Sequence, residues 1–114
     1  MRLKTLTALL IWAGGLLGAA HIVLTPLVYP GWTIDTLWFL GTGLAIVSTA
    51  TANHLGHLPR AKRAWMVLVV LNVVMSGYFA AAWSVIPTPQ VVIGGLLFLG
   101  LAACALAGQR YDMR

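Results

Sequence analysis

Apolar residues are gathered into four long runs, separated by short polar or proline-containing segments. The runs cover residues 5–24, 34–53, 64–85 and 90–108. A helix rises 1.5 Å per residue, so a run of about 20 residues can cross a hydrocarbon core of about 30 Å. The pattern predicts an all-α integral membrane protein, in which residues 1–114 form one domain, an antiparallel four-helix transmembrane bundle.

The first run also has features of a secretory signal peptide. Arg2 and Lys4 precede an apolar stretch, and the small residues 18–20 resemble a cleavage site. The apolar stretch continues to Leu24, which is longer than a usual signal core. We therefore expect this run to remain in the protein as its first span.

Charge separates the two sides of the predicted bundle. Of the 114 residues, 61% are hydrophobic and 8% are charged, against about 25% charged in soluble domains. All 7 basic residues lie in the N-terminal segment, in residues 54–63 or in the C-terminal segment, and four crossings place these segments on one side. Lys and Arg collect on the cytoplasmic side. The position of the basic residues thus predicts cytoplasmic termini in the cell (inner) membrane. The net charge of +5 then indicates contact with lipid headgroups, not a nucleic-acid partner.

Small and polar residues recur at helical spacing on one face of three runs, and we expect these faces to point into the bundle. The faces are Gly14, Gly18, His21 and Thr25; Asp35, Trp38, Thr42, Ala45, Thr49 and Ala52; and Asn72, Ser76, Phe79 and Trp83. The predicted packing and polar-core residues are Gly14, Gly18, Thr42, Asn72 and Ser76. Asn72 is expected to join two helices through a hydrogen bond.

A polar and aromatic group falls in the outer half of the predicted bundle. Ionisable residues at membrane depth are costly and are therefore candidates for function. The predicted ligand-binding residues are His21, Thr25, Tyr29, Asp35, Trp38, Tyr78 and Trp83. An Asp35–His21 pair would respond to protons, because a carboxylate favours the imidazolium form. The simpler alternative is that Asp35 stabilises a helix start, His21 makes one hydrogen bond and the tryptophans form an interfacial belt.

Other chemistry has weaker support in the sequence. His54 and His57 share a helix face and are weak metal or haem candidates, but no third ligand lies near them. Cys104 is the single cysteine of the sequence, so no disulfide is expected. No nucleophile elbow, paired carboxylates or phosphate-binding glycine loop is found. We expect no catalytic residue, metal or cofactor.

These patterns lead to three ranked hypotheses. The first is a non-enzymatic bundle that binds a ligand, a lipid or a partner protein in an outward-facing polar and aromatic pocket. The second is a small oligomeric transporter or channel, and the third is a haem or redox membrane subunit. The expected partners are the lipid bilayer and either a partner membrane protein or further copies of the chain.

Overall fold

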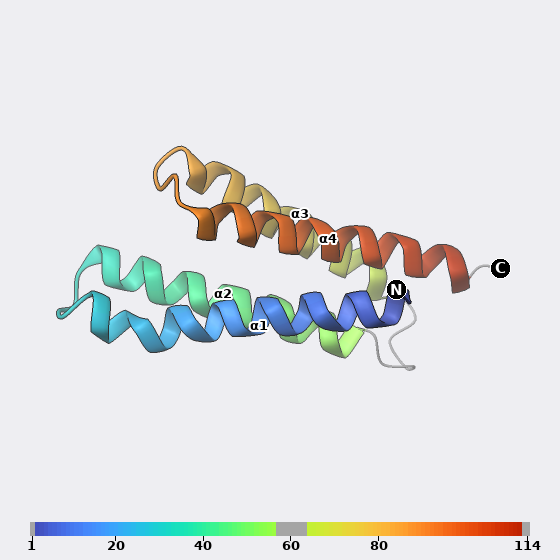
Figure 1. Ribbon diagram of the computed structural model, residues 1–114, viewed down its shortest axis with the longest axis horizontal. Helices are drawn as coiled ribbons and strands as arrows, with labels where there is room; N and C mark the ends of the chain where they lie inside the picture. Colours follow the sequence, from blue (N-terminus) through green and yellow to red (C-terminus); the bar gives the residue numbers. More distant parts are fainter. Residues whose placement is uncertain (1, 57–63, 113–114) are drawn as a thin grey trace.

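The computed structural model describes residues 2–56 and 64–112, and this part of the chain is all-helical. Its helices are α1 (Leu3–Val28), α2 (Ile34–Gly56), α3 (Ala64–Trp83) and α4 (Pro89–Asp112) (Figure 1). Each helix is long and apolar enough to cross a membrane. The four predicted runs are therefore helices, and the differences from the prediction lie at the helix ends.

The end of α1 differs most clearly from the predicted boundary. The sequence predicts a break at Thr25 and Pro26, whereas α1 continues through Pro26 to Val28. Pro26 has no N–H, so the carbonyl of Ile22 loses its helical partner. The Tyr29 N–H donates to the Thr25 carbonyl at 2.9 Å, which closes the last turn. The proline thus lies within the last turn of the helix instead of marking its end.

The start of α2 is fixed by a reciprocal pair of threonines. The Thr36 N–H donates to Thr33 Oγ1 at 3.2 Å, and the Thr33 N–H donates to Thr36 Oγ1 at 3.3 Å. The Thr36 hydroxyl donates to the Gly31 carbonyl at 2.6 Å. These bonds satisfy N–H groups that the first turn of a helix leaves unpaired. Asp35, in the same turn, is exposed and takes no part in the cap.

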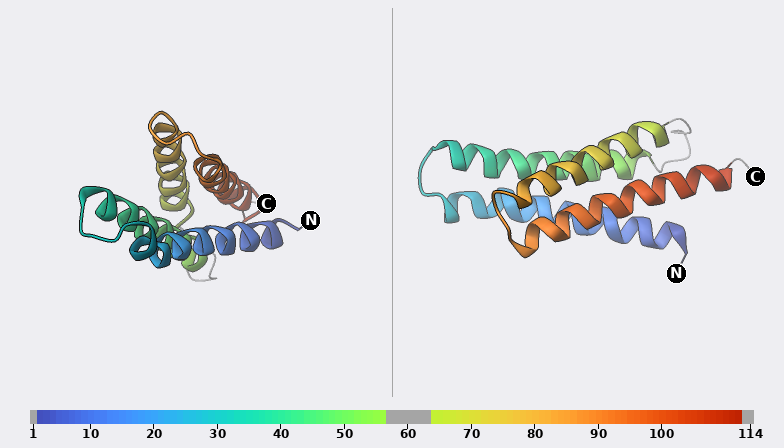
Figure 2. Two further views of the ribbon diagram at one scale, coloured as in Figure 1. Left: turned by 60° about the vertical axis from the view of Figure 1, so that its left-hand side comes forward. Right: turned by 90° about the horizontal axis from the view of Figure 1, so that it is seen from above.

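The helices pack as two close pairs, α1 with α2 and α3 with α4 (Figures 1 and 2). α1 also packs on α4, whereas α2 and α3 share the least contact of the neighbouring helices. The two pairs approach each other near the start of α1 and diverge toward the connections at 29–33 and 84–88 (Figure 1). We call the end with these two connections the loop end, and the opposite end the terminal end.

Two glycine backbones bring α1 and α2 together. A Cβ atom added to Gly18 would lie 2.9 Å from the carbonyl oxygen of Gly43. A Cβ added to Gly43 would lie 2.9 Å from the carbonyl oxygen of Gly18. No side chain fits between the helices here, and small residues at such contacts allow the close van der Waals packing on which helix association in lipid depends.

The contacts follow opposite numerical order along neighbouring helices. Residue numbers rise along α1 as they fall along α2, and the same holds between α2 and α3. The pairs are Gly14 with Ala50, Gly18 with Gly43 and His21 with Phe39, then Thr42 with Tyr78 and Asn53 with Asn72.

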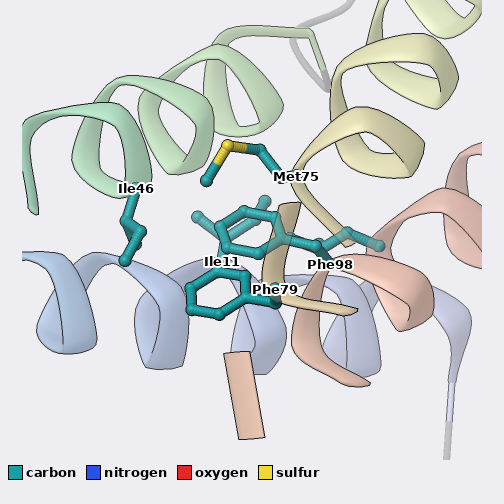
Figure 3. Close-up of a cluster of buried hydrophobic side chains, with 6 residues drawn as sticks. Ile11, Ile46, Met75, Phe79 and Phe98 are labelled. Carbon is teal, nitrogen blue, oxygen red and sulfur yellow. The ribbon is translucent and has the colours of Figure 1, made fainter. Parts of the chain in front are cut away.

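Apolar side chains from all four helices fill the centre of the bundle (Figure 3). The cluster consists of Ile11, Ile46, Met75, Phe79, Phe98 and Leu101. The rings of Phe79 and Phe98 stack with centroids 6.0 Å apart. Gly94 makes room for this stack, because a Cβ there would lie 2.5 Å from the ring of Phe79.

The buried face of α2 corrects the predicted one. Asp35, Trp38 and Ala45, which the sequence places on the inward stripe, are exposed. The buried residues of α2 are Thr36, Gly43, Ile46, Thr49, Ala50 and Asn53. The prediction followed the polar residues of α2. In the structure, the inward positions are those whose size allows contact with α1 and the central cluster.

Gly18→Ala tests the backbone contact between α1 and α2. We expect the free energy of unfolding to fall by about 1–3 kcal/mol, because the added methyl group must push the two backbones apart. Unfolding in SDS, followed by circular dichroism, measures the loss.

Gly15→Ala is the matched control, since an added Cβ there meets nothing within 4 Å. It should be as stable as the wild type or slightly more stable, because alanine favours the helix. Equal stability of the two variants would show that the glycine contact does not hold the pair together.

Candidate functional site

The residues predicted to form one outer pocket occupy separate places at the loop end. His21, Thr25 and Tyr29 lie on the α1–α2 pair, Tyr78 lies between α2 and α3, and Trp83 lies between α3 and α4, while Asp35 and Trp38 are exposed.

His21 is half-buried and held in one orientation. Its Nδ1 lies 2.9 Å from the Leu17 carbonyl oxygen, and its ring stacks on Phe39 with centroids 4.7 Å apart and planes inclined by 28°. The ring of Tyr29 also lies against the ring of Phe39, with centroids 5.3 Å apart. The buried Thr25 hydroxyl donates to the His21 carbonyl at 2.7 Å. We call His21, Phe39 and Tyr29 the imidazole–aromatic cluster.

Asp35 lies apart from this cluster. It is exposed in the first turn of α2, one helical turn before Phe39. Among the described residues, no ion pair or hydrogen bond joins its carboxylate to His21. The structure therefore brings Phe39, and not Asp35, to the imidazole; the sequence analysis did not select Phe39.

A chain of hydroxyl groups links α2 to α3. The Thr42 hydroxyl donates to the Trp38 carbonyl at 2.8 Å, so the 2.9 Å contact between Tyr78 and Thr42 has the tyrosine as its donor. Tyr78 remains 42% exposed. The two residues thus form a polar link at the outside of the least extensive helix contact.

An apolar groove of about 340 Å³ lies between α3 and α4. Its lining residues are Ser76, Phe79, Ala80, Trp83, Val91, Val92, Gly95, Leu96 and Leu99. The Ser76 hydroxyl donates to the Gly95 carbonyl at 3.0 Å and so joins the two helices at the groove. Only Trp83 and Ser76 were among the predicted site residues; nothing in the periodicity distinguishes the α4 lining from other lipid-facing positions.

Asn53 and Asn72 form a closed pair between α2 and α3. Each side-chain amide donates to the other, at 2.8 and 2.7 Å, and both residues are 0% exposed. Asn53 also donates to the Thr49 carbonyl at 2.8 Å. This pairing satisfies two fully buried side-chain amides, for which a missing partner would be costly. The sequence analysis expected Asn72 to join helices but did not identify Asn53 as its partner.

The remaining candidates for metal or redox chemistry stay separate. His54 is exposed near the end of α2, Cys104 is buried as a free thiol, and His57 lies outside the described residues. The described part of the chain contains no group of three or more histidine, cysteine or acidic side chains that could hold a metal ion.

Comparison with known proteins returned no relative. No protein-family model matches the chain, and no curated protein or solved structure matches it.

Asn72→Leu tests the amide pair. The variant leaves the side-chain oxygen Oδ1 of Asn53 without a donor, so we expect a loss of about 1–2 kcal/mol in the free energy of unfolding. The Asn53→Leu, Asn72→Leu double variant should lose less than the sum of the two single variants, because it leaves no unpaired amide. A strictly additive cycle in SDS unfolding would contradict the pairing.

Thr51→Val is the control for removal of a polar group. The exposed Thr51 hydroxyl bonds only to the Val47 carbonyl of its own helix, at 2.8 Å. Its loss should leave the free energy of unfolding close to that of the wild type.

Proposed function

We propose that the chain is a multi-pass protein of the cell (inner) membrane, folded as an antiparallel bundle with both termini in the cytoplasm. The distribution of polarity supports insertion. Large apolar side chains cover the outside, including Leu27 at 76% and Val85 at 79% exposure, whereas Asn53 and Asn72 are fully buried. This arrangement suits a hydrocarbon surrounding, in which polar groups need partners inside the protein.

The order of contacts and the position of charge support the orientation. Opposite residue order along α1 and α2, and along α2 and α3, is the order that an antiparallel bundle requires. All 7 basic residues of the sequence belong to the segments that lie toward the terminal end in this topology, and basic residues favour the cytoplasmic side. The loop end then faces outward.

Within this bundle we propose a non-enzymatic function, binding of a membrane lipid in the groove between α3 and α4. The observation that carries it is the depth of the groove. The groove begins at Val91, close to the start of α4 at Pro89, and reaches Leu99. At 1.5 Å per residue, Leu99 lies about 15 Å from the helix start, which is half of a hydrocarbon core of about 30 Å. A groove that ends at the bilayer midplane fits an acyl chain of the outer leaflet, whereas a transmembrane partner helix would need contact over the full depth.

Trp83 gives the groove an amphipathic mouth. Its side chain is 49% exposed, and none of the described residues accepts a hydrogen bond from its indole N–H. Tryptophan favours the membrane interface because its ring is apolar and its N–H is polar. The indole can therefore donate to the ester or headgroup of a lipid whose chain lies in the groove.

The transporter or channel hypothesis has less support from a single copy of the chain. In the described part, no buried side-chain nitrogen or oxygen lacks a hydrogen-bond partner, and Phe98, Ile46 and Leu101 close the centre. A polar path would therefore have to form between several copies.

The topology predicts which reporters will work. Green fluorescent protein fused after Arg114 should fluoresce, because it folds in the cytoplasm, whereas alkaline phosphatase at that position should be inactive. Alkaline phosphatase fused after Ile86, in the loop-end connection, should be active. The reverse pattern would overturn the proposed orientation without affecting the helix packing.

Ala80→Phe tests the lipid groove. Ala80 is exposed on α3 and lines the groove, so a phenylalanine there should occupy the space of the acyl chain. We expect photo-crosslinking by phosphatidylcholine with a diazirine in the middle of one chain, in nanodiscs, to label α3 and α4 around the groove in the wild type. In the variant this labelling should fall to the level found on the outside of α1.

Ala81→Phe is the matched control, because Ala81 is exposed on the same helix but does not line the groove. It should label like the wild type. Equal labelling of both variants, with folding verified by circular dichroism, would show that the groove holds no lipid more firmly than the rest of the surface.

A further inference from the structure

The imidazole–aromatic cluster on the α1–α2 pair has a defined hydrogen-bonding state. The contact of His21 Nδ1 is with the Leu17 carbonyl oxygen, at 2.9 Å. A carbonyl oxygen only accepts hydrogen bonds, so Nδ1 carries the hydrogen. In the neutral imidazole, Nε2 is then the atom with the free lone pair. The backbone of α1 thus sets the tautomer of the side chain.

The direction of this lone pair is fixed as well. The His21 ring is stacked on Phe39, and its Cβ lies so close to Gly43 that an added Cβ there would be 2.8 Å away. The ring is therefore held by α2 on one side and by its own helix through Nδ1. A side chain held in this way loses little conformational entropy when a ligand binds.

The acceptor is left without a donor inside the protein. Among the described residues, none donates to His21 Nε2, and the hydroxyl of Tyr29 likewise has no partner. His21 lies seven residues before the end of α1 at Val28, about 10 Å along the helix axis. This depth is below the interface in the proposed membrane, where an unpaired polar atom is costly. A donor from outside the chain would remove that cost.

We propose that the imidazole–aromatic cluster is a binding site for a membrane-dissolved hydroxyl compound, whose O–H donates to His21 Nε2. The apolar body of the ligand lies in the lipid-facing surroundings of the cluster, and the hydroxyl of Tyr29 supplies a second polar contact nearer the interface. The ligand class is an alcohol or phenol with a large apolar part. This site lies on a different helix pair from the α3–α4 groove, and it does not depend on lipid binding there.

The test uses the unaltered protein, labelled with ¹⁵N-histidine and placed in phosphatidylcholine nanodiscs at pH 8. Two matched pairs of probes separate the hydroxyl from the apolar body: 4-nonylphenol with 4-nonylanisole, and dioleoylglycerol with trioleoylglycerol. We expect a hydroxyl probe, and not its partner without the hydroxyl, to shift the Nε2 resonance of His21 while leaving that of the exposed His54 unchanged. A response to the phenol alone, to the diacylglycerol alone or to both identifies the source of the hydroxyl.

Two variants complete the test. His21→Gln assigns the resonance by its disappearance, and His21→Phe should weaken binding of the effective probe by about five- to tenfold, the effect of losing one hydrogen bond. His54→Phe is the control and should bind as the wild type does. Equal shifts with a hydroxyl probe and its partner, or no shift with any probe, would overturn the proposal. Neither result would change the loss of lipid labelling expected in Ala80→Phe. Each of the two proposed sites can therefore be disproved without the other.

Discussion

The contact between the Gly18 and Gly43 backbones determines how the first two helices lie and what they present at the loop end. Apolar side chains gain little by leaving lipid for a helix interface, so association depends on close van der Waals packing. Because Gly18 and Gly43 have no side chains, the two backbones approach closely at this level of the bundle. One turn further along α1, the same closeness places the His21 ring on Phe39. The imidazole–aromatic cluster is thus a consequence of the glycine contact.

Different forces act within and between the helix pairs. Within α3–α4, close packing again dominates, because Phe79 lies on Gly94 and stacks on Phe98. Between α2 and α3, the shared contact is small, and the amide pair of Asn53 and Asn72 provides directed bonds. Hydrogen bonds can join two helices over a smaller contact area than close packing requires, because each bond depends on only one donor and one acceptor. The chain therefore uses small residues to form the pairs, and it joins the pairs through the packing of α1 on α4 and through the amide pair between α2 and α3.

The sequence was sufficient for the helices but not for their orientation about their own axes. Length and apolarity define four helices, each long and apolar enough to cross a bilayer. The inward face of α2 was predicted from polar residues and was wrong at Asp35, Trp38 and Ala45, because the small residues Gly43 and Ala50 make the contact with α1.

The tertiary partners were also beyond the reach of the spacing. Asn53 lies three residues before the end of α2, whereas Asn72 lies eight residues after the start of α3. Symmetric counting from the connection does not pair them. The groove depends on how α3 and α4 pack at Gly95 and Ala80, so it could not be read from either helix alone.

The buried polar side chains of the described residues are hydrogen-bonded, whereas some partly exposed ones have no partner. Toward the terminal end, the buried polar side chains are paired: Thr7 donates to Leu3, and Asn53 and Asn72 satisfy each other. At the loop end, the described residues leave His21 Nε2 and the Trp83 N–H without partners. In the proposed topology this end contains no Lys or Arg. That lack of positive charge fits the proposed binding of uncharged parts of amphipathic molecules at the loop end, whereas the basic residues of the other side favour the cytoplasm in the same topology.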